Sequence, residues 1–551
     1  MIGKDRHGNN CRRTDNPVRR SLGDGQDCPS YDCANSRFAG PKRFCGIVVL
    51  GLLLSAGMAG PLSAEAPQWR PGLTDRELAI ARWFSALTFM QDRSATPWPE
   101  WHDDGAQLGT TSLRYQLAFA GYGCTAIAAK TPAYRELAEK QLRDLCERMI
   151  DPRVWSYATR YWKYGDQPTD PCLYENVMYT GHLTQLMCFY ELMTGDRRYS
   201  EAGWDFVGRD GRKVHYNLRQ AIERLHVQSE KSASGGICCE PGLIFATCNA
   251  HSASSFVLFD LLHGTQYARV NQKWFAWMAE NFRIRHPLSR DFLCTVYEER
   301  RGRFVPVGDV GADCWTLGWG YPWFPSTDLA EQGWRHILKK ADWRQAGPDQ
   351  LYAQGNPLVG CCGGGSTPVG NAFIPLLAVQ VEGRGSPTAQ KILRWLEVTC
   401  GREADLDGDG HRESYYYHTD PATRIATTGI IATALATDRG SLRHLYSTPR
   451  RSILDAPTVA HVDYPNVYVR TAEYLAPVLR FTVRKGVAGF RGKTEIVCTQ
   501  IPKKATVTRD GEAFADFTQT DSRVVIRTDV DREHVFEVAL VAPITSARSG
   551  D

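Results

Sequence analysis

Two cysteines in one glycine-flanked segment have the type and spacing for acid–base chemistry. Residues 235–250 read GGICCEPGLIFATCNA, which puts Cys239 and Cys248 nine positions apart and Glu240 directly after the first thiol. A thiol near a helix N-terminus or a histidine has a lowered pKa, so such a pair can supply one proton donor and one proton acceptor. A disulfide or two inert buried thiols would fit the same residues. Zinc binding is less favoured, because the usual Cys-x-x-Cys spacing is missing.

A histidine and a tyrosine upstream are the candidate partners of these thiols. His182 lies in YENVMYTGHLTQLMCFY, four residues after Met178 and therefore on the same face of a helix. A histidine beside a thiol makes that thiol reactive near neutral pH, whereas a core histidine bonded to a backbone carbonyl is the plainer alternative. Tyr115 lies in the aromatic-rich run LRYQLAFAGYGC, which suits either a pocket wall or an ordinary core.

The elements that must position these groups are helices. From residue 75 to about residue 446, apolar residues recur mostly with the helical period, and one helix is expected over 252–262. Gly195 and Gly264 end two similar apolar runs, YELMTGDRRY and FDLLHGTQYA, and lie 69 residues apart. This spacing corresponds to two helices and their connections. It predicts a mainly α fold of stacked helical hairpins closed into an (α/α)6 toroid, with an open superhelix as the alternative.

The chain changes character after Arg450. Segments such as VLRFTVRK, TEIVCTQI and HVFEVAL alternate apolar with polar residues and are split by turn residues such as Asp510-Gly511. The pattern predicts a small antiparallel β-domain over residues 451–551, a sandwich by preference. It carries no obvious catalytic cluster, and we expect it to pack on a helical domain that spans residues 65–450.

The first 64 residues predict export. Residues 44–54 read FCGIVVLGLLL, follow Lys42 and Arg43, and precede small residues that end at Ala64. This order is typical of a secretory signal, and the apolar core is short for a membrane span. We therefore predict a periplasmic or secreted protein with no stable membrane insertion after cleavage. An uncleaved N-terminal anchor is the alternative.

The length and charge of the chain limit the classes of protein to which it can belong. A chain of 551 residues with 43% hydrophobic residues is expected to form more than one globular domain. The net charge of +4 comes from 65 basic and 61 acidic side chains without long runs, which argues against nucleic-acid binding. A soluble enzyme is the expected class.

One further motif could hold a metal. DLDGDGHRE places Asp405, Asp407 and Asp409 at alternate positions, as in the opening of a calcium loop, but Tyr416 stands where the usual Glu would be. A structural Ca²⁺ site and a plain solvated turn both fit. The glycine-rich run VGCCGGG over 359–365 lacks the Lys-Ser/Thr of a phosphate loop. No cofactor is expected for catalysis.

Taken together, the motifs resemble those of the linalool dehydratase/isomerase family. The resemblance rests on LRYQLAFAGYG, ENVMYTGHL, GGICCEP with TCN downstream, DLLHGTQY, and CWTL at 314–317. It implies an α/α toroid, secretion to the periplasm, and a homo-oligomer whose active sites lie near subunit interfaces. It also implies cofactor-free removal or addition of water on a small hydrophobic alkenol, such as a tertiary allylic terpene alcohol.

The resemblance also implies roles for individual residues. Cys239 and Cys248 match the paired thiols, His182 the acid/base helper and Tyr115 a hydroxyl in the pocket. The substrate-contacting positions are matched by Met178, Glu240, Phe245 and Trp315. Dehydration needs a proton at the departing hydroxyl, shelter for a cation and a base for the neighbouring C–H. We assign His182 and Cys239 to protonation at oxygen and Cys248 to proton removal at carbon, with the reverse order left open.

Several family positions differ here. The family's acidic helix residue and two of its tyrosines are replaced, in chain order, by Thr88, Ser94 and Gly311. Asp92 is expected one turn after Thr88 on the same helix face, where it would substitute for the lost carboxylate. The two positions that pair as a disulfide in the family hold Pro97 and Asp151. A changed substrate is therefore expected.

Two other classes of function remain open from sequence. A carbohydrate-active hydrolase or lyase on an α/α toroid would use paired carboxylates, for which the candidates are Asp92, Asp103, Asp313 and Glu240. A non-catalytic protein with bridged cysteines is the third class. Free thiols at Cys239 and Cys248 separate the first hypothesis from the other two.

Overall fold

The computed structural model describes residues 69–105, 107, 111–158, 170–208, 210–305, 308–355, 368–405, 410–502 and 504–541. All described residues belong to one compact unit, which lies within Pro67–Asp551. The predicted leader, the VGCCGGG segment, Asp407 and Asp409 lie outside the described residues. Among the described helices, none has both the length and the apolar character needed to span a bilayer.

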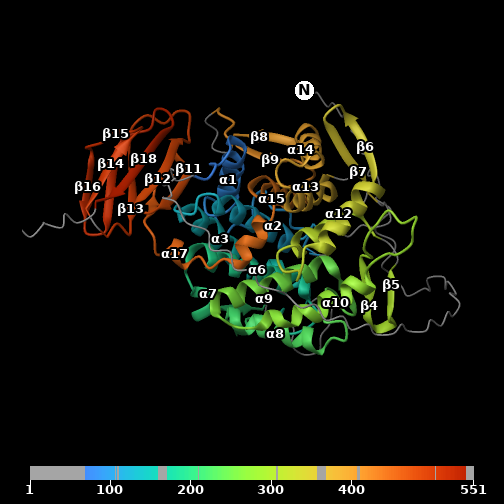
Figure 1. The fold of residues 1–551 in the computed structure, drawn as a ribbon. Coiled ribbons are helices and arrows are strands. Elements are labelled where there is room, and N and C mark those ends of the chain that lie inside the picture. The colour runs from blue at the N-terminus through green and yellow to red at the C-terminus, as the bar shows by residue number, and fades with distance from the viewer. Residues whose placement is uncertain are drawn as a thin grey trace, which may run out of the picture. The chain divides into compact units, whose positions relative to one another are not determined.

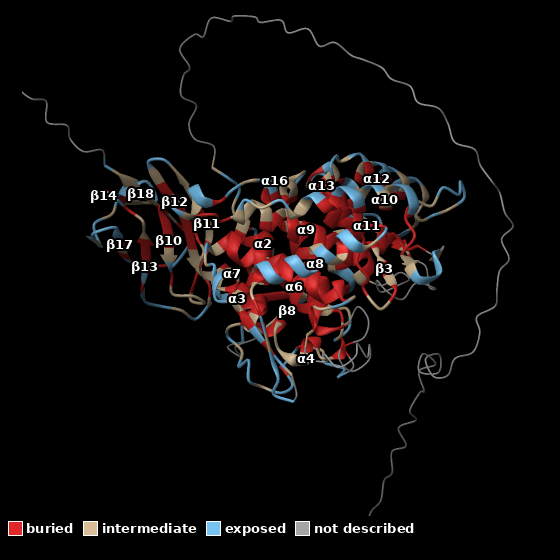
Figure 2. Cartoon of the chain, turned by 90° about the horizontal axis from the view of Figure 1, so that it is seen from below, coloured by how far each residue is buried: buried red, intermediate tan, exposed pale blue. Residues whose placement is uncertain are grey.

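Helix is the commonest secondary structure of the described chain, as predicted (Figure 1). Some helices are apolar all round and buried along nearly their whole length, which Figure 2 shows in red. They are α2 (Leu113–Ala129), α6 (Val177–Thr194), α9 (Ala246–His263), α11 (Val310–Gly320), α13 (Pro368–Glu382) and α15 (Arg424–Ala436). Each packs on the next in this order, and α15 packs back on α2. The buried helices therefore contact one another in a closed cycle.

Other helices carry one apolar face and one polar face, and cover the buried ones. They are α3 (Glu136–Met149), α8 (Leu218–Lys231), α12 (Asp328–Lys340) and α14 (Pro387–Cys400). α3 packs on α2 and α6, α8 on α6 and α9, α12 on α11 and α13, and α14 on α13. The further α-helices are α1 (Asp75–Leu87), α4 (Pro152–Trp155), α7 (Arg198–Glu201), α10 (Asn271–Asn281), α16 (Ser441–Ser447) and α17 (Arg451–Leu454).

Two helix ends follow the glycine signals of the sequence. α6 ends at Gly195 and α9 at Gly264, whose φ angles of +74° and +65° are left-handed. A glycine takes this conformation without the steric cost that a Cβ atom would add. The predicted helix–turn pattern is confirmed at both places.

Strands after residue 457 form two antiparallel sheets, as the alternating pattern predicts. One sheet has the order β10-β13-β17-β16 and the other β11-β12-β18-β14-β15. Their bounds are β10 Thr458–His461, β11 Val467–Leu475, β12 Val478–Lys485, β13 Lys493–Thr499, β14 Ala505–Arg509, β15 Glu512–Ala513, β16 Phe517–Thr520, β17 Arg523–Asp529 and β18 His534–Leu540. Both sheets contribute to one apolar core, to which Phe481, Ile496, Ile526 and Phe536 belong. The edge strands β10 and β16 escaped prediction because each is too short to show alternation.

Short antiparallel hairpins interrupt the helical part, and the helical pattern did not predict them. They pair β1 (Trp204–Val207) with β2 (Lys213–Tyr216), β4 (Val296–Glu298) with β3 (Leu243–Phe245) and β5 (Arg303–Val305), β6 (Asp342–Gly347) with β7 (Gln350–Gln354), and β8 (Gly401–Ala404) with β9 (Ser414–Tyr417). β3 matters most for the chemistry, because its last residue directly precedes α9.

Candidate active site

Cys248 lies within the first turn of α9. The helix begins at Ala246 rather than at residue 252, so the expectation of a loop thiol is wrong. Tertiary hydrogen bonds explain the earlier start: the Asn249 amide donates to the carbonyl of Phe245 at 2.8 Å and to that of Ile237 at 2.9 Å. They hold a turn whose residues have weak helix propensity. The free N–H groups of a first turn favour a thiolate there.

The loop that carries Cys239 is fixed against the same helix. Oδ1 of Asn249 accepts a hydrogen bond from the Ile237 N–H at 2.7 Å, so one side chain ties the loop to α9 through both of its polar atoms. The chain then reverses in a turn over 240–243, closed by a 2.8 Å backbone hydrogen bond. Gly242 takes a φ of +76° in this turn, which glycine alone adopts readily.

His182 reaches the thiols from α6. α6 lies close to α9 because Gly181 has no side chain, and a Cβ atom there would be 3.1 Å from the backbone nitrogen of Ser252. Nδ1 of His182 is 2.8 Å from the hydroxyl of Tyr122. Burial lowers the pKa of His182, and contact with Cys248 opposes that effect only in part. Nε2 is buried and makes no hydrogen bond with any described residue, so this nitrogen can exchange a proton.

Tyr115 completes the contacts of Cys248. Its hydroxyl lies 3.4 Å from Sγ of Cys248. Burial raises the pKa of Tyr115 well above its usual value, and the two thiols raise it further, so the phenol stays protonated and can donate to the sulfur. The ring stands edge-on to His182 at 5.2 Å and to Trp315 at 5.8 Å between ring centroids.

The two thiols have opposite protonation preferences. Burial alone would raise the pKa of Cys248, but contacts with Cys239, His182 and Tyr115 outweigh it and hold that pKa well below the ordinary thiol value. Burial and the neighbouring Cys248 raise the pKa of Cys239 well above that value. Within this pair Cys248 is the more acidic thiol and Cys239 the less acidic one.

Arg114 is a buried arginine beside the thiols that sequence reasoning missed. Nη1 donates to the carbonyl of Gln107 at 2.6 Å and Nη2 to Sδ of Met178 at 3.2 Å. The guanidinium lies 4.9 Å from the Tyr115 ring centre. Burial raises the pKa of Cys239, and the charge of Arg114 limits that rise. The available signal was a single charge in the otherwise apolar run LRYQLAFAGYG.

The predicted wall residues occupy different parts of this region. Trp315 on α11 is buried, and its ring stacks on that of Phe373 at 4.9 Å. Met178 on α6 is buried against Arg114. Glu240 and Phe245 are half-buried on the turn and strand that lead into α9, and burial raises the pKa of Glu240.

Asp92 does not lie where the sequence placed it. α1 ends at Leu87, so the expected helix face at Asp92 does not exist. Asp92 is exposed and accepts hydrogen bonds from the backbone and hydroxyl of Ser94 at 2.8 Å. Thr88 caps the helix: its backbone N–H bonds to the carbonyl of Ser85 at 3.2 Å, and its buried hydroxyl donates to the carbonyl of Phe84 at 2.7 Å.

Arg153 connects the segment after α1 to the start of α4. Its Nε and Nη2 donate to the Asp151 carboxylate at 2.9 and 2.8 Å, and Nη1 donates to the carbonyl of Ala95 at 2.7 Å. The guanidinium also lies 4.0 Å from the centre of the Trp98 ring. Family resemblance would place paired cysteines at residues 97 and 151, so a charged tether joins the same two segments here.

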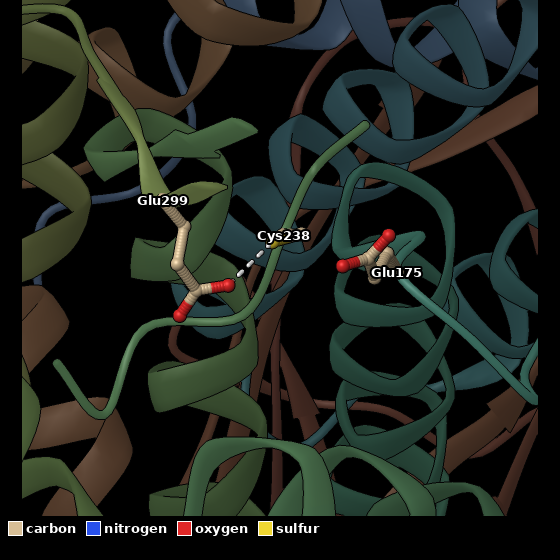
Figure 3. Close-up of side chains that lie close together, drawn as sticks. All are labelled: Glu175, Cys238 and Glu299. Carbon is tan, nitrogen blue, oxygen red and sulfur yellow. Dashed lines mark hydrogen bonds between the residues drawn. The ribbon is translucent and has the colours of Figure 1, made fainter. Parts of the chain in front are cut away.

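A separate cluster surrounds the neighbouring thiol, Cys238 (Figure 3). Its Sγ donates to Oε2 of Glu299 at 3.5 Å, and one ligand atom each from Glu175, Cys238 and Glu299 lie within 4.8 Å of one another. This donor set could hold a divalent cation. Glu175 also contacts Arg300 at 3.8 Å, and Glu299 accepts from the Ser232 hydroxyl at 3.4 Å. The cluster is thus stabilised by hydrogen bonds and an ion pair of its own.

The calcium motif is only partly described. One oxygen of Asp405 accepts a hydrogen bond from the backbone N–H of Gly410 at 2.9 Å. Since Asp407 and Asp409 lie outside the described residues, Ca²⁺ binding there stays a prediction.

One segment of the chain matches the model of a known family. Residues 114–356 match the family model of linalool dehydratase/isomerase, which confirms the resemblance seen in the motifs. This span contains Tyr115, His182, both active-site thiols and Trp315. The family is one of enzymes.

Solved structures of other enzymes are similar only at a distance. They include an α-1,6-mannanase from Salegentibacter sp. HEL1_6, with 10% identity and a TM-score of 0.40 over 68% of this chain and 98% of that chain. An unsaturated glucuronyl hydrolase specific for heparin has 10% identity and a TM-score of 0.38 over 58% of this chain and 84% of that chain. A β-L-arabinofuranosidase from Geobacillus stearothermophilus T6 has 13% identity and a TM-score of 0.34 over 85% of this chain and 79% of that chain. These similarities assign neither substrate nor reaction.

Proposed function

We propose that this protein is a cofactor-free lyase or isomerase of the linalool dehydratase/isomerase type, acting on a small tertiary or allylic alkenol. The observation that carries the proposal is the pair of buried thiols with opposite pKa shifts, beside a neutral histidine with a free Nε2. Such a pair supplies an acid and a base together in a site without bulk water.

The pKa directions favour one order of proton transfers. Cys239 gives its proton to the substrate hydroxyl, the C–O bond breaks, and water leaves a carbocation behind. The Cys248 thiolate removes a proton from the neighbouring carbon, and the C–H electron pair becomes the new double bond. Proton transfer from Cys248 back to Cys239 restores both groups. His182 assists at oxygen through Nε2, and the faces of Tyr115 and Trp315 shelter the cation.

We infer an (α/α)6 toroid for the helical part. The inference is supported by the closed cycle of contacts among α2, α6, α9, α11, α13 and α15, with the amphipathic helices outside. An open superhelix would leave α15 far from α2, whereas these two helices pack closely against each other. The thiol centre draws its residues from α2, α6, α9 and α11 and from the loop before β3, which carries Cys239.

The carbohydrate-active alternative has less support among the described residues. Asp313 is buried and accepts backbone hydrogen bonds from Phe292 at 2.8 Å and Leu293 at 3.0 Å, which is a structural role. Asp92 and Asp103 lie on exposed turns, bonded to nearby residues. Among the four candidate carboxylates, Glu240 alone lies beside the thiols, and a pair is needed.

Alkene production tests the proposal. The full chain, purified with reductant and without oxygen, is incubated with a panel of small tertiary and allylic alcohols, and alkene is followed by headspace mass spectrometry. Cys239→Ala, Cys248→Ala and His182→Ala should each slow alkene formation by about 10²-fold or more, while Cys238→Ala, at the adjacent buried thiol, serves as matched control. Alkene that persists in all three variants, or no alkene with a folded wild type across the panel, would contradict this chemistry.

The remaining expectations stay predictions. They are a periplasmic or secreted location, a homo-oligomer with active sites near its interfaces, a structural Ca²⁺ at Asp405 to Asp409, and no catalytic cofactor. Phe245 and Glu240 are proposed to contact substrate, whereas Asp92 would do so only from the exposed turn described above.

A further inference from the structure

A second buried histidine, His251, lies on α9 one turn after Cys248. Its side chain is 0% exposed. Nε2 accepts a hydrogen bond from the indole N–H of Trp315 at 2.7 Å, and Nδ1 is 2.6 Å from Oε1 of Gln185. An indole N–H can only donate, so Nε2 carries no proton and Nδ1–H donates to the amide oxygen. Both ring nitrogens of His251 are thus committed in the neutral form.

The amide that receives this hydrogen bond is fixed in turn. Nε2 of Gln185 donates to the hydroxyl of Tyr446 at 2.5 Å. Trp315, His251, Gln185 and Tyr446 therefore form one buried chain that runs between α11, α9, α6 and α16. Both ring nitrogens of His251 have a partner in this chain, which gives His251 a single orientation.

His251 also contacts the proton-transfer residues of the centre. The rings of His251 and His182 lie 3.9 Å apart at their centroids, with planes at 35°. Trp315, held by His251, stands edge-on to Tyr115, whose hydroxyl contacts Cys248. One residue thus contacts His182 directly and reaches Tyr115 through Trp315.

We infer that His251 is a positioning residue, which holds the Trp315 indole by hydrogen bonding and the His182 ring by close ring contact, and so sets the geometry around Cys248. The inference rests on the proposed function for its effect on turnover, but its geometric part concerns the thiol itself. A protonated His251 would lose the Trp315 bond, since both nitrogens would then be donors. Its titratable neighbours are His182, Tyr122 and Tyr446.

Two substitutions at His251 separate the effect of its hydrogen bonds from the effect of the space that its side chain fills. His251→Leu fills that space with an apolar side chain and removes both hydrogen bonds, whereas His251→Gln keeps an acceptor and a donor. Trp315→Phe removes the indole donor and leaves His251 in place, which provides a second route if His251→Leu does not fold. Phe259→Leu, two turns further along α9 and buried away from the thiols, is the matched control for destabilisation.

The first readout is the titration of Cys248, which needs no substrate. Thiolate absorbance is measured against pH for each full-length variant, and the same protein with Cys248→Ser is subtracted. We expect His251→Leu and Trp315→Phe to raise the titration midpoint of Cys248 toward that of an ordinary thiol. His251→Gln should stay nearer wild type, and Phe259→Leu should not move the midpoint.

The second readout is turnover of any alcohol that the wild type converts. We expect His251→Leu to lower kcat by roughly tenfold to a hundredfold, because misplaced acid–base groups react slowly, with a smaller change in KM. An unchanged midpoint in folded His251→Leu or Trp315→Phe, or an equal shift in Phe259→Leu, would overturn the inference. If the midpoint shifts but the wild type makes no alkene, the positioning role stands and the proposed function fails.

Discussion

Cys238 and Cys248 are two thiols of one segment with equal burial and opposite chemistry. Their exposed fractions are 5% and 3%, so access to water does not distinguish them. Cys238 faces two carboxylates, and burial and these negative charges raise its pKa. Cys248 faces a phenol, an imidazole and a second thiol, which overcome burial and lower its pKa. The comparison teaches that the partners of a buried thiol decide its protonation state.

Cys239 lies between Cys238 and Cys248 in the sequence, and its surroundings are those of Cys248. It is adjacent to Cys238 in the chain, yet its main partner is Cys248 and not the carboxylates of Glu175 and Glu299. The backbone carbonyl of Cys238 accepts from the N–H of Val177 at 3.1 Å, which fixes the loop at the start of α6. One loop therefore presents Cys239 toward Cys248 and Cys238 toward the acidic cluster.

The largest expected difference between the two thiols is in turnover. Cys248→Ala should lower the alkene-forming rate by about 10²- to 10⁴-fold, the usual contribution of a positioned acid or base. Cys238→Ala should stay within about twofold of wild type, because that thiol is outside the proton-transfer pair. Headspace mass spectrometry on folded variants checks both values. Equal losses of alkene-forming rate in the two variants would contradict the different roles of the two thiols.

The pH dependence of turnover should reflect the opposite shifts of Cys248 and Cys239. Activity needs the Cys248 thiolate, whose lowered pKa keeps it present below the ordinary thiol range, and the Cys239 thiol, whose raised pKa keeps it present above that range. Activity should therefore fall as the pH drops through the Cys248 pKa and as it rises through the Cys239 pKa. His182→Ala removes one contact that lowers the Cys248 pKa, so the acidic limb should move to higher pH. The profile of kcat/KM measures this, and a fixed acidic limb would contradict the assigned role.

Alkylation should distinguish the thiols without any substrate. At neutral pH, iodoacetamide should modify Cys248 before Cys238, because the thiolate is the nucleophile and only Cys248 has a lowered pKa. Mass spectrometry with fragmentation locates the modified residue over time. Faster modification of Cys238 in the folded protein would show that its carboxylates do not suppress the thiolate.

The smallest expected effect concerns the acidic cluster alone. Glu299→Gln removes one of the negative charges that raise the Cys238 pKa, so alkylation of Cys238 should become faster by a few-fold at alkaline pH. Alkene formation should not change, because Glu299 has no contact with Cys248 among the described residues. A slower enzyme would mean that the two thiol environments are coupled through the loop.

Sequence patterns predicted the parts of this molecule that depend on local chemistry. Glycines at residues 195 and 264 marked the helix ends, because a left-handed backbone needs them. Motif order joined Tyr115, His182 and Cys248, which the structure brings into contact. The C-terminal strands with clear alternation were also predictable, whereas the short edge strands were not.

The parts that escaped prediction depend on contacts between distant residues. His251 follows Cys248 closely, yet its role depends on Trp315, 64 residues further along the chain. The start of α9 depends on hydrogen bonds from Asn249 to a separate loop, and no local propensity reports them. Asp92 was misplaced because α1 ends at Leu87, and residues 85–92 hold no glycine or proline that would mark this end in the sequence.

The tether made by Arg153 contains no cysteine, so it does not depend on the redox conditions around the protein. Every described cysteine is free, and the link between residues 95 and 151 consists of hydrogen bonds and an ion pair. Reductant that keeps Cys239 and Cys248 as thiols therefore leaves this link intact, whereas a disulfide would open under the same treatment. The tether is instead sensitive to salt, which screens the ion pair between Arg153 and Asp151. Conditions that protect the catalytic thiols thus also preserve the architecture that holds them.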